Sequence, residues 1–79
     1  MKDRERDIMR KIILSIVKKG HCHWTDLKKR VLSSRYPFAT SNTFNKQHQY
    51  LLNKGFIERV SRGIYRVTEK GEKYLEILS

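Results

Sequence analysis

The polar side chains of residues 41–54 are the part of this sequence whose types and spacing favour a specific chemistry. On a helical wheel they gather opposite the apolar residues and on the flanks of that side: Asn42, Thr43, Asn45, Lys46, Gln49 and Asn53. An amide offers a donor and an acceptor in one plane, which matches the major-groove edge of adenine, and a lysine can reach guanine. Solvated helices usually carry Glu and Lys instead, because Asn and Thr are poorer helix formers.

We therefore expect this segment to recognise base edges. Residues near the start of such a helix approach the bases most closely. The predicted base-reading residues are Asn42, Thr43, Asn45, Lys46 and Gln49. The alternative is a solvated helix face that happens to lack acids.

Basic side chains before and after this segment could hold a phosphate backbone. They form two groups, Lys28, Lys29 and Arg30 on one side and Arg59, Arg62 and Arg66 on the other. We expect the first group to contact phosphates, and the second to lie along a minor groove or its phosphates.

Other chemistries have less support. His21, Cys22 and His23 are zinc-binding residue types, but neighbouring side chains rarely converge on one ion, and no second cluster supplies further ligands. The sequence offers no paired carboxylates, no nucleophile beside a base and no phosphate-binding loop. We expect no catalytic residue, metal, cofactor or small-molecule ligand, and no enzyme activity.

Length and charge point to one small basic domain. The chain has 79 residues, so a single domain over residues 1–79 is expected, and 18 Lys and Arg against 8 Asp and Glu give a net charge of +10. Residues 8–57 contain ten of the bases and a single acid, whereas residues 1–7 and 69–79 are nearly neutral. This distribution predicts a polyanionic partner bound by the middle of the chain.

Cysteine content and hydropathy predict the cellular compartment of the protein. Cys22 is the only cysteine, which excludes an intramolecular disulfide. The longest apolar run, residues 12–17, is far below the roughly 18 residues that cross a bilayer. Without an apolar N-terminal stretch, we expect a cytoplasmic, nucleoid-associated protein with no membrane partner.

The first two helices are predicted from apolar spacing. Apolar residues recur every three or four positions from Ile8 to Val17, and Gly20 follows. Leu14 falls off this apolar side, so it is either a lone exposed leucine or part of a contact with another chain. Thr25 is expected to cap a second helix. The inner stripe of that helix is Leu27, Val31 and Leu32.

The third helix is expected at about residues 41–54, with Thr40 or Ser41 as its cap and Gly55 just past its end. Its apolar side contains His48, which we interpret as a core-edge histidine rather than a pH switch. Phe38 is also assigned to the core. Trp24 and Tyr36 could stack on nucleic acid, but in so small a domain we interpret them as core residues as well.

A hairpin and a last helix complete the prediction. Residues 56–67 contain two β-branched and aromatic runs separated by only three residues, which predicts a tight hairpin. Thr68 is expected to cap a short helix through Leu78, in which Gly71 is a mild weakness.

The order of these elements resembles a winged helix-turn-helix. Residues 40–59, "TSNTFNKQHQYLLNKGFIER", resemble the recognition helix and following strand of that class. Residues 63–78, "GIYRVTEKGEKYLEIL", resemble the second wing strand and C-terminal helix of MarR-like and PadR-like regulators, including small proteins of archaea and their viruses. The wing loop is short, and the long dimerisation helices of the MarR-like family are absent.

This resemblance implies an α+β fold with three helices, a two-stranded wing hairpin and a short C-terminal helix. It implies sequence-specific binding of double-stranded DNA by a transcriptional regulator, with residues 41–54 in the major groove and 56–67 as the wing. Two alternatives stay open. A winged-helix protein-interaction module would need an apolar patch on the third helix, and an RNA-binding domain would need exposed aromatic rings.

We also expect a homodimer, because one small module makes too few contacts for tight specific binding. Surplus apolar side chains on the first and last helices could form its interface: Leu14, Tyr74, Leu75, Ile77 and Leu78. Two copies could approach at the nearly neutral chain ends without opposing their positive fields.

Overall fold

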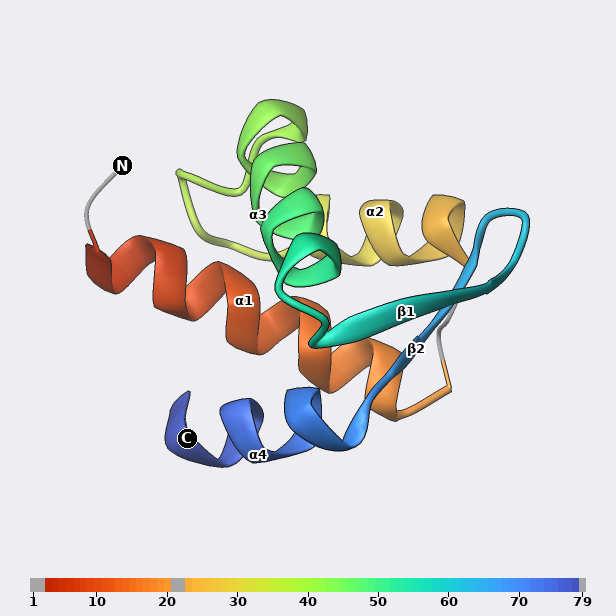
Figure 1. Cartoon of the computed structure of the whole chain (residues 1–79). Helices are drawn as coiled ribbons and strands as arrows, with labels where there is room; N and C mark the ends of the chain where they lie inside the picture. The colour runs from red at the N-terminus through yellow and green to blue at the C-terminus, as the bar shows by residue number, and fades with distance from the viewer. Residues whose placement is uncertain (1–2, 21–22, 79) are drawn as a thin grey trace.

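Residues 3–20 and 23–78 are described by a computed structural model, and within these ranges the chain forms four helices and one antiparallel hairpin, an α+β arrangement. The elements in chain order are α1 (Asp3–Lys18), α2 (Trp24–Leu32), α3 (Ser41–Asn53), β1 (Ile57–Ser61), β2 (Ile64–Val67) and α4 (Glu69–Leu78) (Figure 1). Every predicted helix and strand is present, with small differences at the ends. None of the helices in the described ranges is long and apolar enough to span a membrane.

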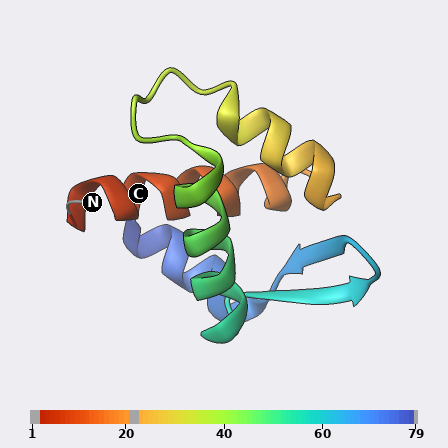
Figure 2. The same ribbon diagram turned by 90° about the horizontal axis from the view of Figure 1, so that it is seen from above.

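α1 lies at the centre of the fold and contacts α2, α3, α4 and β2. α3 lies above it and α4 below it in Figure 1, and Figure 2 shows α3 crossing over it. Leu14 is fully buried together with Met9 and Ile13, so the prediction that it is exposed or meets another chain is wrong. Because neighbours cover α1 on several sides, the helix buries more than one stripe of its surface.

α2 begins two residues earlier than expected and uses a different cap. His23, not Thr25, is the N-cap residue, and its side chain makes no capping hydrogen bond. The Trp24 backbone N–H instead donates to the Gly63 carbonyl at 2.7 Å, next to a bridge between His23 and Ile64. A carbonyl from the hairpin therefore accepts a bond from one of the free amides at the start of α2.

α3 has the predicted cap and end. The Thr40 hydroxyl accepts a hydrogen bond from the Thr43 backbone N–H, and the Thr43 hydroxyl accepts one from the Thr40 N–H. Lys54 is the C-cap residue, and Gly55 follows with a φ of +78°, a conformation that glycine adopts at little cost. This reciprocal capping fixes where the helix starts.

The aromatic core differs from the prediction at one residue. Trp24 packs against the core, with its ring centroid 5.8 Å from that of Phe44. Phe38 is half-buried as expected, but Tyr36 is 45% exposed and stacks on Phe38 from outside. Tyr36 starts a turn in the loop between α2 and α3, where its carbonyl accepts the Ala39 N–H at 3.0 Å, and its ring lies outside the helix contacts.

Gly71 is needed for packing and is not the weakness that its helix propensity predicts. The Thr68 hydroxyl caps α4 by accepting from the Gly71 backbone N–H at 3.0 Å. A Cβ on Gly71 would overlap the Phe56 carbonyl oxygen and lie 2.8 Å from the carbonyl carbon. The same oxygen accepts the Thr68 N–H, so it cannot move away without losing that bond. Glycine therefore allows α4 to approach the start of the hairpin.

Gly71→Ala should destabilise the protein by about 1–3 kcal/mol or more, because the methyl group meets backbone atoms. Helix propensity alone predicts the opposite sign, a gain of about 1 kcal/mol. Urea unfolding followed by circular dichroism measures the difference, with the exposed change Glu76→Ala on the same helix as control. A stabilised Gly71→Ala variant would contradict the close approach.

Candidate nucleic-acid interface

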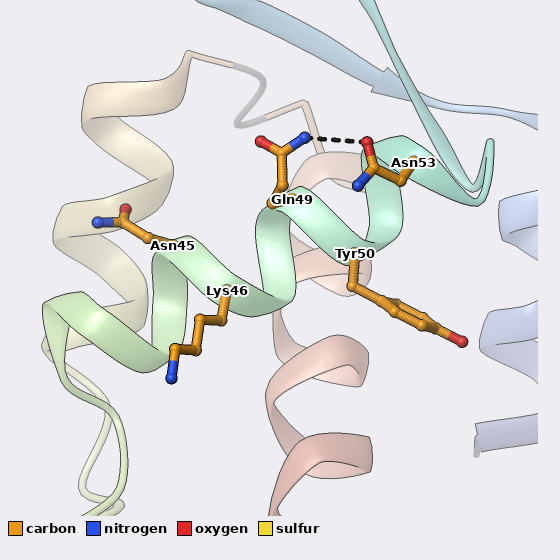
Figure 3. A pocket seen from close by; sticks show the side chains of 5 residues that line it. All are labelled: Asn45, Lys46, Gln49, Tyr50 and Asn53. Carbon is orange, nitrogen blue, oxygen red and sulfur yellow. Dashed lines mark hydrogen bonds between the residues drawn. The ribbon is translucent and has the colours of Figure 1, made fainter.

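The outer side of α3 is polar and exposed as predicted. We call it the amide face, and it consists of Asn42, Asn45, Lys46, Gln49 and Asn53. All five residues are exposed, and the last four line a shallow surface pocket together with Tyr50 (Figure 3). No acidic residue lies within α3. The described residues with large exposed apolar side chains are Leu32, Tyr36, Val60 and Ile77, and none of them belongs to α3.

Thr43 is the one predicted base-reading residue that does not lie on the amide face. Its hydroxyl is 2.5 Å from the Phe38 carbonyl oxygen and also takes part in the cap with Thr40. The side chain is half-buried and occupied by these bonds. We therefore remove it from the base-reading set and keep the other four predicted residues.

Gln47 is buried, a position that the sequence prediction missed. It is only 5% exposed, and its Oε1 accepts a hydrogen bond from Arg10 Nε at 2.8 Å. The same guanidinium donates to the Tyr74 hydroxyl at 3.1 Å and lies 3.6 Å from the centre of the Tyr50 ring. The sequence did contain a sign of this burial, because the helical wheel places Gln47 beside the apolar Phe44 and Leu51, and a buried polar side chain needs a hydrogen-bond partner.

The basic residues beside α3 differ in how far they are already paired. Arg30 Nε is 3.1 Å from Asp26 Oδ2 along α2, and Arg66 pairs with Glu58 across the hairpin. Lys28 Nζ lies 4.9 Å from the Trp24 ring. The remaining three residues of the predicted set are exposed and have no ion pair within the described ranges: Lys29, Arg59 and Arg62. Exposed ion pairs contribute only about 0–1 kcal/mol, so a phosphate could replace the acids at Arg30 and Arg66.

The hairpin begins just after α3 and extends to the start of α2 (Figure 1). β1 and β2 pair antiparallel with Glu58 opposite Arg66, and an irregularity follows Arg59. Arg62 and Gly63 form the tip, where Gly63 has a φ of +74° that suits a tight turn. The tip is fixed to the start of α2 by the Gly63 carbonyl.

The predicted dimer residues separate into two sets. Leu14 and Leu75 belong to the core, and Tyr74 stacks on Phe56 with ring centroids 4.2 Å apart, so these residues are used within one chain. Leu78 is half-buried, and Ile77 is 78% exposed. Only Ile77 of the five is left fully available for another chain.

The zinc interpretation lies mainly outside the described part of the chain. His21 and Cys22 are not among the described residues, and His23 is exposed. Within the described ranges no three His, Cys, Asp or Glu side chains are grouped so that they could hold a metal ion.

His48 lies beneath the amide face and touches the hairpin. It is 5% exposed, its ring meets Tyr65 edge-on at 4.6 Å, and Phe44 lies 5.6 Å away. Its Nε2 is buried with no hydrogen-bond partner in the described residues. Burial disfavours the charged imidazolium, which lowers the pKa of His48 from its ordinary value near 6.5.

Comparison with protein-family models, with curated proteins and with solved structures found no match.

Burial of His48 should make the protein less stable as pH falls from 7.5 to 5.5. Above its ordinary pKa, His48 is neutral in both the folded and the unfolded chain, and below that pKa only the unfolded chain binds the proton. The free energy of unfolding then falls by at most about 1.4 kcal/mol per pH unit, and the fall stops below the lowered pKa that His48 has in the folded chain. Urea unfolding of the native chain and of His48→Leu across this range measures it. Equal pH dependence in the two proteins would contradict the assignment.

Proposed function

We propose that this protein binds double-stranded DNA sequence-specifically as a winged helix-turn-helix transcriptional regulator. α3 enters the major groove, and the hairpin serves as the wing. The observation that carries the proposal is the amide face: five exposed amide and lysine side chains, with no acid in the helix, on an element fixed by a cap and by buried contacts. The donors and acceptors of such side chains match base edges, whereas an ordinary solvated helix usually carries Glu and Lys instead.

The surroundings of α3 support the same geometry. Arg59 and Arg62 are exposed on the hairpin that follows α3, and Lys29 is exposed on α2, which packs against α3. Phosphate contacts of this kind set the orientation of a protein on the duplex, while base contacts set its sequence preference. A net charge of +10 favours association with a polyanion.

Two alternatives are less well supported. A protein-interaction module would use an apolar patch, and the amide face has no large exposed apolar side chain within the described residues. An RNA-binding domain would stack bases on exposed rings. Tyr50 on α3 is half-buried beneath Arg10, and the exposed Tyr36 ring lies off α3, in the loop between α2 and α3, where it stacks on Phe38. Duplex RNA and single-stranded RNA serve as competitors in the binding experiment below.

Binding to duplex DNA should weaken steeply with salt, because each neutralised phosphate releases counterions and adds about −0.9 to the slope of log K against log salt. Anisotropy titrations of a duplex selected from a random pool measure this slope.

Lys46→Ala should lose roughly 1–3 kcal/mol of binding free energy on the selected sequence and relax the sequence preference. Arg62→Ala should weaken all duplexes alike.

The matched control for this titration is Lys73→Ala on α4, where the lysine pairs with Glu69. That change should leave the slope nearly unaltered. No duplex binding at low salt, a slope near zero, or preferential binding of either RNA would overturn the proposed function.

We further propose that the DNA-binding form is a homodimer in which Ile77 of α4 contacts a second copy. Half-sites about 34 Å apart would then each take one α3. Ile77→Glu should convert a dimer at micromolar concentration into a monomer near 9.5 kDa, measured by light scattering. Leu32→Glu places the same charge on another exposed apolar residue and should leave the dimer intact. If the native chain is a monomer at this concentration, the proposed dimer is contradicted.

A further inference from the structure

We infer that Gln49 and Asn53 act as one hydrogen-bonded unit that reads a single adenine from the major groove. The inference rests on the proposed DNA binding and names the base that this part of the amide face accepts. Asn53 lies at the last position of α3 and becomes a specificity-determining residue through its bond to Gln49.

The geometry of the pair is defined by one bond. Gln49 Nε2 donates to Asn53 Oδ1 at 2.9 Å, and the two residues are four apart, so they lie one above the other on the helix (Figure 3). Both side chains are exposed in the shallow pocket. The bond uses one hydrogen of the Gln49 amino group and leaves that amide with its second N–H as a donor and its carbonyl oxygen as an acceptor. Turning both amides over makes Asn53 the donor of the bond, and Asn53 then keeps one N–H and its carbonyl oxygen in the same way.

This set of free groups complements adenine. The major-groove edge of adenine presents the N7 acceptor and the N6 amino donor side by side. Guanine presents two acceptors, so the free amide carbonyl would face another oxygen. Thymine offers only its O4 acceptor and a methyl group, and cytosine only its amino donor. One amide that keeps an N–H and its carbonyl oxygen, and that is held in place by the bond to its neighbour, therefore favours adenine over the other three bases.

The two side chains are already ordered in the protein without DNA. Its mutual bond limits the rotamers of two flexible side chains, which lowers the entropy lost on binding. Beneath it, the helix is fixed by Tyr50 under the Arg10 guanidinium, and the Lys54 backbone N–H bonds to the Tyr50 carbonyl at 2.9 Å. Asn45 and Lys46 lie about one turn before Gln49, so we expect them to contact neighbouring bases.

Base analogues test the pair on the full chain. In a selected duplex, each adenine in turn is replaced by 7-deazaadenine, which lacks the N7 acceptor, or by purine, which lacks the N6 amino group. We expect one adenine position at which either analogue weakens binding on the order of 10-fold or more. Gln49→Met and Asn53→Leu keep the side-chain shapes while removing the amides. In both variants that adenine should become insensitive to the analogues.

Lys46→Ala is the matched control on the same face, and it should keep the sensitivity at that adenine while relaxing preference at another position. Far-UV circular dichroism checks that each variant keeps its helices, and low-salt titration preserves measurable binding through phosphate contacts. Specific binding with no sensitive adenine, or sensitivity that is retained in either Gln49→Met or Asn53→Leu, would overturn this inference alone. Absence of any duplex binding would overturn the proposed function together with it.

Discussion

The side chain of Arg10 connects three helices where they cross. From α1 it donates to Gln47 of α3 and to Tyr74 of α4, and its guanidinium covers the Tyr50 ring. A charged group in a partly buried position is costly unless hydrogen bonds and an aromatic face compensate for lost water, and here both do. Because Gln47 and Tyr50 lie on α3, these contacts fix the rotation of α3 about its axis. That rotation decides which side chains form the amide face.

The hairpin contacts α2, α3 and α4. The Gly63 carbonyl accepts from the start of α2, and Tyr65 packs edge-on against His48 of α3. At the base of the hairpin, Gly71 allows α4 to approach Phe56 closely. Each contact is short-range and specific, so the amide face and the hairpin arginines are held in one fixed relation. A fixed relation is what simultaneous contact with a groove and its flanking phosphates requires.

Charge and hydrogen bonding are divided between different parts of this surface. The amide face supplies directional donors and acceptors, and the basic groups stand beside it on α2 and the hairpin. The two acids in this region, Asp26 and Glu58, are paired with Arg30 and Arg66. They therefore neutralise neighbouring arginines and leave Lys46 and Arg62 with their charge. Such a division suits a surface in which charge attracts a partner and amides discriminate among its sequences.

The sequence by itself determined the elements, because helix spacing, caps and turn residues act within a few residues of one another. It therefore predicted the order of helices and strands, the cap of α3 and all five members of the amide face. Only the tertiary structure decided which side chains those elements cover. Leu14 is buried because α1 is surrounded by other elements, and Gln47 because Arg10, distant in sequence, reaches it. Gly71 is required by the backbone at Phe56, whereas Tyr36 lies on the outer side of Phe38 and is exposed. Burial depends on partners far along the chain, and local patterns carry no record of where those partners lie.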